Sequence, residues 1–285
     1  MKKGSKVGVI CCSNAQPLSR KDKINRLINT LSDIGLTAVL SDCIFSANTP
    51  FGFSGKERAQ ALMSLYDDNE IDAIFDISGG DLANEVLPYL DFKKIRNSNK
   101  SFWGYSDLTT IINAIYAKAG KQSVLYQVRN LIYDNADRQI CDFTDTVMNS
   151  KKSLFDFDYE FIQGDRINGV LVGGNIRCLL KLAGTPYFPD MTDKILLLES
   201  LGGAGERITA YMCQLEQMGM LEKINGIILG TFTEMQEKSC SPDVTEIVRG
   251  FVGQVLPIDK TEQIGHGTNS KAAVIGSEIC LCKNQ

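Results

Sequence analysis

Histidine occurs once in this chain of 285 residues, as His266 in a loop between Gly265 and Gly267. Imidazole is the side chain best suited to accept and return a proton near neutral pH. If the chain performs serine-type hydrolysis, His266 must therefore be its base, and a metal site built from several imidazoles is excluded. A single histidine can also be an idle surface or core residue, so its significance depends on a nucleophile and an acid elsewhere.

Ser106 is the candidate nucleophile, in the run Trp-Gly-Tyr-Ser-Asp-Leu at 103–108. The run joins an apolar strand to a helix, and such a sharp turn exposes the serine Oγ beside the N–H groups that begin the helix. Gly104 provides the small residue two positions before the serine. Leu108 stands where the G-x-S-x-G pattern has its second glycine, so the pattern is incomplete. The alternative is that Ser106 only caps the helix.

Glu199 is the candidate acid, because it follows the apolar run 195–198 directly. A carboxylate at the end of a buried strand needs a polar partner or water. The alternative is a partly exposed residue at the end of a strand, without a catalytic role.

Ser106, Glu199 and His266 together predict a Ser-His-acid triad, since a triad is defined by geometry and not by chain order. Ser106 would attack a carbonyl carbon, His266 would take the serine proton and pass it to the leaving amine, and Glu199 would fix the imidazole tautomer. The backbone N–H of Asp107 and one from the Gly79-Gly80 turn would bind the oxyanion. Each such donor contributes about 3 kcal/mol in the transition state.

Apolar runs typical of buried strands alternate with segments of helical periodicity in the first half of the chain. Strands are expected at 6–12, 37–40, 71–77 and 101–105, and helices at 18–35, 55–69, 82–90 and 107–119. This alternation predicts a parallel sheet with right-handed crossovers, similar to flavodoxin. Ligands of such sheets bind beyond the carboxyl ends of the strands, where the Gly79-Gly80 turn and Ser106 lie.

The alternation resumes in the second half, with strands expected at 167–172, 194–198, 224–229 and 271–282 and helices at 176–183, 206–219 and 242–255. The segment 136–163 is polar and weakly patterned, and we interpret it as a crossover that could cover a cleft. The sequence therefore predicts an α/β protein of two domains. Residues 1–135 would carry the nucleophile, and residues 164–285 the acid and the base.

Composition restricts the partners of the protein. The net charge is −4 without a dense basic stripe, so nucleic acid is not an expected partner. No segment reaches membrane-spanning length, and the apolar run 7–12 is too short for a signal peptide, so a cytoplasmic location is expected. The nine cysteines form no C-x-x-C pair, which argues against a zinc ribbon. Most of them are expected to be small buried residues in a reducing compartment.

Five motifs in matching order make the chain similar to the L,D-carboxypeptidases of serine peptidase family S66. That family includes murein tetrapeptide carboxypeptidases and microcin C immunity proteins. The motifs are Ser78-Gly79-Gly80-Asp81, Gly104-Tyr105-Ser106-Asp107, Gly173-Gly174-Asn175 with Gly184-Thr185, Glu199 followed by Arg207-Ile208, and Gly265-His266 with Ile275-Gly276.

The resemblance implies the same triad, with oxyanion donors from the backbone of Asp107 and Gly80. It also implies a two-domain fold, with the serine on the first domain and the acid and base on the second. A homodimer is expected, and neither a metal nor an organic cofactor. Among the shared motifs, Gly79, Asn175 and Arg207 are candidates for contact with substrate.

Three departures from the family pattern concern the expected substrate cleft. Gln127 and Val128 follow Tyr126 where the family usually has Gly-Pro, Ser78 replaces an arginine, and Val274 replaces a proline. Three functions therefore stand side by side. The first is removal of the terminal D-alanine from a murein tetrapeptide during cell-wall recycling. The second is cleavage of an amide in a peptidyl- or aminoacyl-nucleotide antibiotic. The third is non-catalytic binding of a small anionic ligand.

Two further groups of residues bear on substrate recognition. A carboxypeptidase must bind a free carboxylate, and Arg207 and Arg129 are candidates because guanidinium binds carboxylate through two N–H groups. Each could instead be a solvated charge. Immunity-type enzymes tend to stack an aromatic residue, often Trp, on a nucleotide base. The only Trp here, Trp103, lies in a predicted strand. Phe157 or Tyr159 could substitute for it, and the alternative is that both anchor the crossover.

Overall fold

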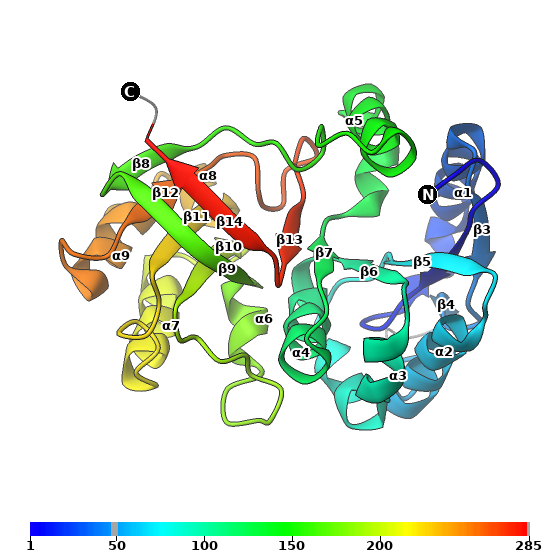
Figure 1. The fold of residues 1–285 in the computed structure, drawn as a ribbon, viewed down its shortest axis with the longest axis horizontal. Coiled ribbons are helices and arrows are strands. Elements are labelled where there is room, and N and C mark those ends of the chain that lie inside the picture. The colour runs from blue at the N-terminus through cyan, green and yellow to red at the C-terminus, as the bar shows by residue number, and fades with distance from the viewer. Residues whose placement is uncertain (47–50, 284–285) are drawn as a thin grey trace.

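The computed structural model describes residues 1–46 and 51–283, which form two α/β domains with one large sheet in each (Figure 1). The first domain runs from blue to green in the figure, and the second from green to red. Within the described residues, no helix is both long and apolar enough to cross a membrane.

The first sheet has the strand order β13-β7-β6-β5-β1-β3. Its parallel strands are β1 (Lys6–Ile10), β3 (Thr37–Leu40), β5 (Ile71–Asp76), β6 (Ser101–Gly104) and β7 (Ser123–Leu125). Numbered along the chain these five strands stand in the order 2-1-3-4-5, which is the flavodoxin-like arrangement predicted from the sequence. The order reverses between β1 and β5, so a ligand site is expected where these two strands end. A separate short pair is formed by β2 (Gln16–Pro17) and β4 (Phe45–Ser46).

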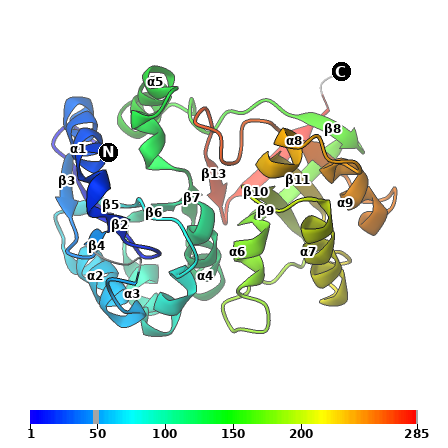
Figure 2. The same cartoon turned by 180° about the vertical axis from the view of Figure 1, so that it is seen from behind.

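Helices cover both faces of this sheet (Figures 1 and 2). They are η1 (Leu18–Arg20), α1 (Lys21–Ile34), α2 (Gly55–Asp67), η2 (Ala83–Tyr89), α3 (Phe92–Asn97), η3 (Ser106–Leu108), α4 (Thr109–Ala119), η4 (Val128–Ile132) and α5 (Ala136–Asn149). The segment expected as a helix at 82–90 forms the 3-10 helix η2. It contains Pro88, which lacks the N–H that an α-helix would use.

The second sheet has the order β14-β9-β10-β11-β12-β8. Its parallel centre is β9 (Arg166–Asn175), β10 (Lys194–Ser200), β11 (Gly226–Phe232) and β12 (Ile258–Lys260), and its antiparallel edges are β8 (Glu160–Gln163) and β14 (Glu278–Cys282). The helices of this domain are α6 (Ile176–Leu180), α7 (Gly205–Gln217), α8 (Thr233–Glu237) and α9 (Val244–Val252). The predicted two-domain α/β fold is confirmed.

The two domains share one hydrophobic core, because α4 packs against β9 of the second sheet. Asn113 of α4 donates to the Gly173 carbonyl at 2.9 Å and accepts from the Gly173 amide at 2.8 Å. A Cβ on Gly174 would lie 2.8 Å from Thr109 Oγ1. The glycines of the Gly-Gly-Asn motif thus allow a helix of one domain to approach a strand of the other at close range.

The segment 136–163, expected as an irregular crossover, contains helix α5 and strand β8. Helix α5 buries Phe143 and Val147 in the core of the first domain. The helix is amphipathic, but two of its inward positions are polar. Gln139 Oε1 accepts from the Tyr126 hydroxyl at 2.6 Å, and the Asp142 carboxylate accepts from Lys271 Nζ at 2.6 Å.

The last predicted strand, 271–282, is two strands in different sheets. Strand β13 (Ala273–Ile275) pairs with β7 in the first domain, and β14 pairs with β9 in the second. Gly276 separates them with φ +87°, which lets the chain turn from one sheet to the other. Figure 1 shows β13 in red beside β7, at the centre of the molecule.

The cysteines fit their predicted role only in part. All nine are free thiols, and four of them are buried, namely Cys11, Cys12, Cys43 and Cys178. Cys141, Cys280 and Cys282 are exposed. Burial raises the pKa of Cys11 and Cys12 well above the ordinary value, which keeps both as unreactive thiols.

Asp259 on β12 is fully buried, and neither of its carboxylate oxygens has a hydrogen-bond partner among the described residues. Burial raises its pKa from 3.8 to about 7. The folded state therefore holds the proton more tightly than the unfolded chain does. Consequently the stability of the protein falls as the pH rises from about 4 to about 7, where the carboxylate becomes charged.

We predict that Asp259→Asn raises the free energy of unfolding by about 1–3 kcal/mol at pH 8, because it removes a buried charge that lacks a partner. The gain should shrink at pH 5, where the carboxyl group is protonated in the folded protein. Denaturant unfolding at both pH values measures this. Asp72→Asn, at an exposed site on β5, is the control and should change little. An equal gain at both pH values would contradict the argument.

Candidate active site

Ser106 lies in the turn between β6 and α4 with φ +56°, in the left-handed region that non-glycine residues rarely adopt. A Cβ on Gly104 would lie 2.7 Å from Leu108 Cβ, so this position requires glycine. The Ser106 side chain does not cap the following helix, and its Oγ contacts His266 instead. This strained turn has the geometry of a nucleophile elbow.

His266 lies between Ser106 and Glu199. Its Nε2 is 3.1 Å from Ser106 Oγ, and its Nδ1 is 2.6 Å from Glu199 Oε2. Glu199 is fully buried at the end of β10. An ionised Glu199 accepts a hydrogen bond from the Nδ1–H group of His266. The lone pair of Nε2 is then free to accept the hydroxyl proton of Ser106. The structure thus brings together the three residues that the sequence singled out, from two different sheets.

The His266 loop is held tightly against β11. Gly265 has φ +149°, and a Cβ there would lie 1.9 Å from Thr231 Oγ1. Ser270 Oγ lies 2.6 Å from the carbonyl oxygens of both Gly265 and Gly267. These contacts fix the backbone on both sides of the imidazole.

Tyr105 packs beside the imidazole, with its ring centroid 4.5 Å from that of His266. Burial, and then the charge of Glu199, raises the pKa of Tyr105 well above 10. The phenol therefore stays protonated and supplies a neutral wall to the site.

The two predicted oxyanion donors have free N–H groups. No described atom accepts a hydrogen bond from the backbone N–H of Asp107 or of Gly80. Gly80 has φ +122°, and a Cβ there would lie 2.2 Å from Asn14 Cγ, so only glycine fits. Both donors can therefore serve a ligand, which is the property that an oxyanion site needs.

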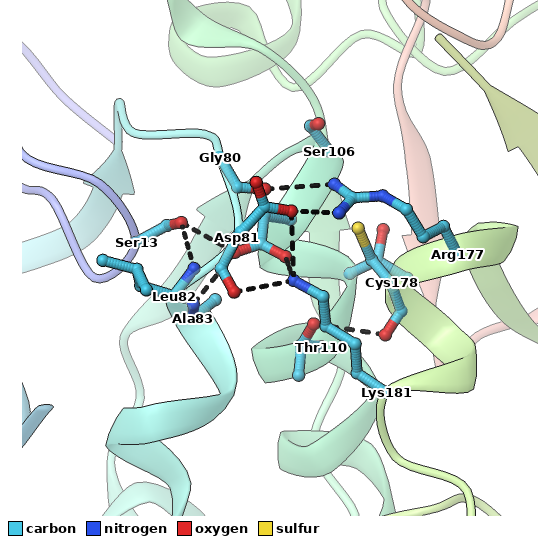
Figure 3. A network of polar contacts seen from close by, with 12 residues as sticks. Ser13, Gly80, Asp81, Leu82, Ala83, Ser106, Thr110, Arg177, Cys178 and Lys181 are labelled. Carbon is cyan, nitrogen blue, oxygen red and sulfur yellow. Dashed lines mark hydrogen bonds and ion pairs between the residues drawn. The ribbon is translucent and has the colours of Figure 1, made fainter. Parts of the chain in front are cut away.

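Arg177 of α6 and Lys181, the residue that directly follows this helix, form a network of charges that fixes both donor segments (Figure 3). Arg177 donates to the Gly80 carbonyl at 3.1 Å and forms an ion pair with Asp81. Lys181 donates to the Asp81 carbonyl at 2.8 Å and to the carboxylate of Asp107. Helix α6 belongs to the second domain, so the second domain positions the donor loops of the first.

The carboxylate of Asp107 is fully buried at the centre of this network. Besides Lys181 it binds the first domain, since its Oδ2 accepts from Ser13 Oγ at 2.7 Å and from the Ala83 amide at 2.9 Å. All its partners are donors, as a buried carboxylate requires. From the sequence, Asp107 was expected only as a backbone donor, and Arg177 and Lys181 were not expected at the site.

A cleft of about 640 Å³ opens beside Ser106 and His266. It lies at the carboxyl ends of β1 and β5, where the strand order reverses. Its lining consists of Asn14, Ala15, Gln16, Pro17, Arg20, Ser46, Gly79, Gly80, Tyr105, Ser106, Gln127, Arg129, Leu201 and His266. Residues 136–163, expected as a possible cover, contribute no residue to this lining in the described part of the chain.

The remaining sequence candidates lie elsewhere. Asn175 is buried as the N-cap of α6, with Oδ1 accepting from the Cys178 amide, and Arg207 is exposed on α7. Neither lines the cleft among the described residues. Phe157, Tyr159 and Trp103 are also absent from the described lining. The rings of Phe157 and Tyr159 pack on each other, and Trp103 is buried in the core.

Comparisons with known proteins agree with this arrangement. Residues 7–126 match the model of the LD-carboxypeptidase N-terminal domain, and residues 168–281 match that of the LD-carboxypeptidase C-terminal domain. The chain is 28% identical over 297 aligned positions to a probable murein peptide carboxypeptidase of Bacillus subtilis, covering 99% of this chain and 90% of that protein.

Two further relatives are immunity proteins or resemble them. The chain is 26% identical to the microcin C7 self-immunity protein MccF of Escherichia coli, with 80% of this chain and 75% of that protein covered. The crystal structure of an MccF-like protein from Bacillus anthracis superposes with a TM-score of 0.87 at 24% identity, covering 100% of this chain and 95% of that one. The resemblance found in the sequence is confirmed.

We predict that Lys181→Met lowers the free energy of unfolding by about 3 kcal/mol, because it leaves the buried Asp107 without its counter-ion. Lys238→Met removes a similar but exposed ion pair, with Glu234, and should leave the free energy of unfolding almost unchanged. Adding Asp107→Asn to Lys181→Met should recover part of the loss. Chemical denaturation compares the variants, and equal small effects for both lysines would refute the network.

Proposed function

Because the chain belongs to the LD-carboxypeptidase family, we propose that it removes the terminal D-alanine from a murein tetrapeptide through a triad of Ser106, His266 and Glu199. The observation on which the proposal rests is the unbroken hydrogen-bonded series Ser106–His266–Glu199 at the wall of the cleft. A carboxypeptidase needs a nucleophile and a proton acceptor beside an open site. Ser106 and His266 supply the two groups, and the cleft is the open site.

The geometry supports a two-step acyl transfer. Ser106 Oγ attacks the carbonyl carbon of the peptide bond while His266 Nε2 takes the hydroxyl proton. The oxyanion forms beside the amides of Asp107 and Gly80. The C–N bond then breaks as His266 returns the proton to the nitrogen of D-alanine. Water, deprotonated by the same imidazole, attacks the acyl-serine ester and releases the shortened peptide and Ser106.

Glu199 acts on the reaction through His266. Its carboxylate accepts a hydrogen bond from Nδ1–H and so keeps that proton on Nδ1. Nε2 therefore faces the serine with its lone pair. It also stabilises the imidazolium that forms during each step. Because Glu199 is buried, its charge acts on the imidazole with little screening by water.

The B. subtilis relative favours a murein peptide as the substrate, since the similarity extends over almost the whole chain. Cleavage of a peptidyl-nucleotide antibiotic is the second candidate, and it is favoured by the similarity to MccF. Besides His266 itself, Tyr105 is the one residue with an aromatic ring in the described lining of the cleft. The residues considered for stacking on a base, Phe157 and Tyr159, lie outside it. The murein peptide is therefore our first choice.

We predict that Ser106→Ala and His266→Ala each lower kcat for D-alanine release by more than about 1,000-fold. Glu199→Gln should lower it by about 100-fold or more, because the imidazole loses its charged partner. The purified protein would be incubated with murein tetrapeptide and, separately, with an aminoacyl-nucleotide conjugate, and the products would be analysed by mass spectrometry. Ser64→Ala, on the exposed face of α2, should leave the rate unchanged.

The substrates and variants in this experiment separate the alternatives. Release of the aminoacyl group with no D-alanine would favour the antibiotic substrate. Activity that survives in both Ser106→Ala and His266→Ala would exclude the triad. Binding of a substrate with no turnover by the unmodified protein would favour the non-catalytic alternative. The expected homodimer and cytoplasmic location stay predictions.

A further inference from the structure

The cleft has an unbalanced charge. Two guanidinium groups, Arg20 and Arg129, belong to its lining, and no aspartate or glutamate does in the described part of the chain. None of the six residues outside the described ranges has an acidic side chain either. Positive charge without nearby negative charge favours an anionic ligand.

Both arginines are held by neutral partners. Arg129 donates from Nε at 3.1 Å and from Nη2 at 2.9 Å to Gln127 Oε1, and Arg20 donates to Gln16 Oε1 at 3.2 Å. Neither forms an ion pair among the described residues. The glutamine oxygens thus orient the guanidinium groups without neutralising them. Three of the five N–H groups of Arg129 stay available, which includes the pair needed for a carboxylate.

Three other arginines of this chain form ion pairs with acids, namely Arg58 with Glu85, Arg138 with Asp142 and Arg177 with Asp81. Arg129 forms none among the described residues and lines the cleft, so its charge is available to a ligand there.

Arg129 is the better placed of the two arginines. It is half-buried, whereas Arg20 is exposed at the mouth of the cleft. Arg129 lines the same cleft as Ser106 and His266. The side-chain amide of the next residue, Asn130, donates to the Gly267 carbonyl at 3.5 Å, which places this segment beside the His266 loop. An arginine in a partly buried position binds an anion more strongly than one in open solvent.

We propose that Arg129, oriented by Gln127, binds the C-terminal carboxylate of the peptide substrate. This inference rests on the proposed function and adds the group that selects a free carboxyl end. Arg20 adds attraction for anions at the mouth of the same cleft.

The inference is tested with two substrates that differ only at the C-terminus, one a free acid and the other an amide. The wild-type protein should prefer the acid in kcat/KM, since Arg129 gains a charged hydrogen-bond partner only with the acid. Arg129→Met should lower kcat/KM for the acid by about 10- to 100-fold and leave that for the amide almost unchanged. Most of the change should appear in KM.

Three further variants make the test specific. Arg129→Lys should restore part of the preference, because it returns the charge without the planar pair of N–H groups. Gln127→Leu should weaken the preference with the charge retained. Arg166→Met, at an exposed site on β9, is the matched arginine control. Thermal unfolding of each variant shows that it is folded.

Two results would overturn the inference. One is a wild-type protein that does not distinguish acid from amide, and the other is an equal loss for both substrates in Arg129→Met. Inorganic phosphate and adenosine monophosphate are included as competitors. Strong competition by either that depends on Arg129 would assign the arginine to phosphate and would also overturn the carboxylate assignment.

The test stays valid if the proposed function fails. Should the wild-type protein hydrolyse neither peptide, calorimetry on Ser106→Ala with the two peptides measures binding alone. Tighter binding of the acid, lost in Ser106→Ala/Arg129→Met, would support the carboxylate site without hydrolysis. Equal binding of both peptides would refute it.

Discussion

The contact between α4 and the backbone of Gly173 and Gly174 is the constraint on which the site depends. Ser106 follows β6 of the first sheet, and His266 and Glu199 belong to the second domain. The 3.1 Å distance between His266 Nε2 and Ser106 Oγ joins side chains of the two domains, so it requires that the domains dock in one way only. The hydrogen bonds of Asn113 to the Gly173 backbone, and the absence of side chains at the two glycines, provide that docking. The charges of Arg177 and Lys181 then fix the loops of Gly80 and Asp107 across the same boundary.

Local patterns in the sequence were enough to predict much of this arrangement. Alternation of apolar strands and periodic helices gave the two α/β domains, and the residue types at strand ends gave Ser106 and Glu199. Since the chain has one histidine, the base followed by elimination. Helix α5 was missed because polar residues at buried positions, such as Gln139, have partners that only the fold supplies. Arg177 and Lys181 were missed because nothing in their local sequence indicates which loop of the other domain they contact.

The candidates for substrate contact show that a sequence motif does not tell where a side chain lies. Asn175 and Arg207 lie in motifs shared with the family, yet one caps a helix and the other faces solvent. A motif indicates that a residue matters without showing whether it binds a ligand or supports the backbone. Arg20, by contrast, belongs to no motif and lines the cleft because η1 directly follows β2, whose residues line the same cleft. Whether each of these residues lines the cleft depends on long-range topology, which residue spacing does not reveal.

Strand β13 has a consequence for how the protein forms during synthesis. The ribosome releases the whole flavodoxin-like half of the chain long before residues 273–275, so the edge of β7 has no strand partner while the second domain is being made. An unpaired edge can associate with other chains. Strand β13 adds the edge strand of the first sheet, and β14, a few residues later, adds the edge strand of the second. They also follow the His266 loop directly, so the nascent chain completes its two sheets only after His266 has emerged.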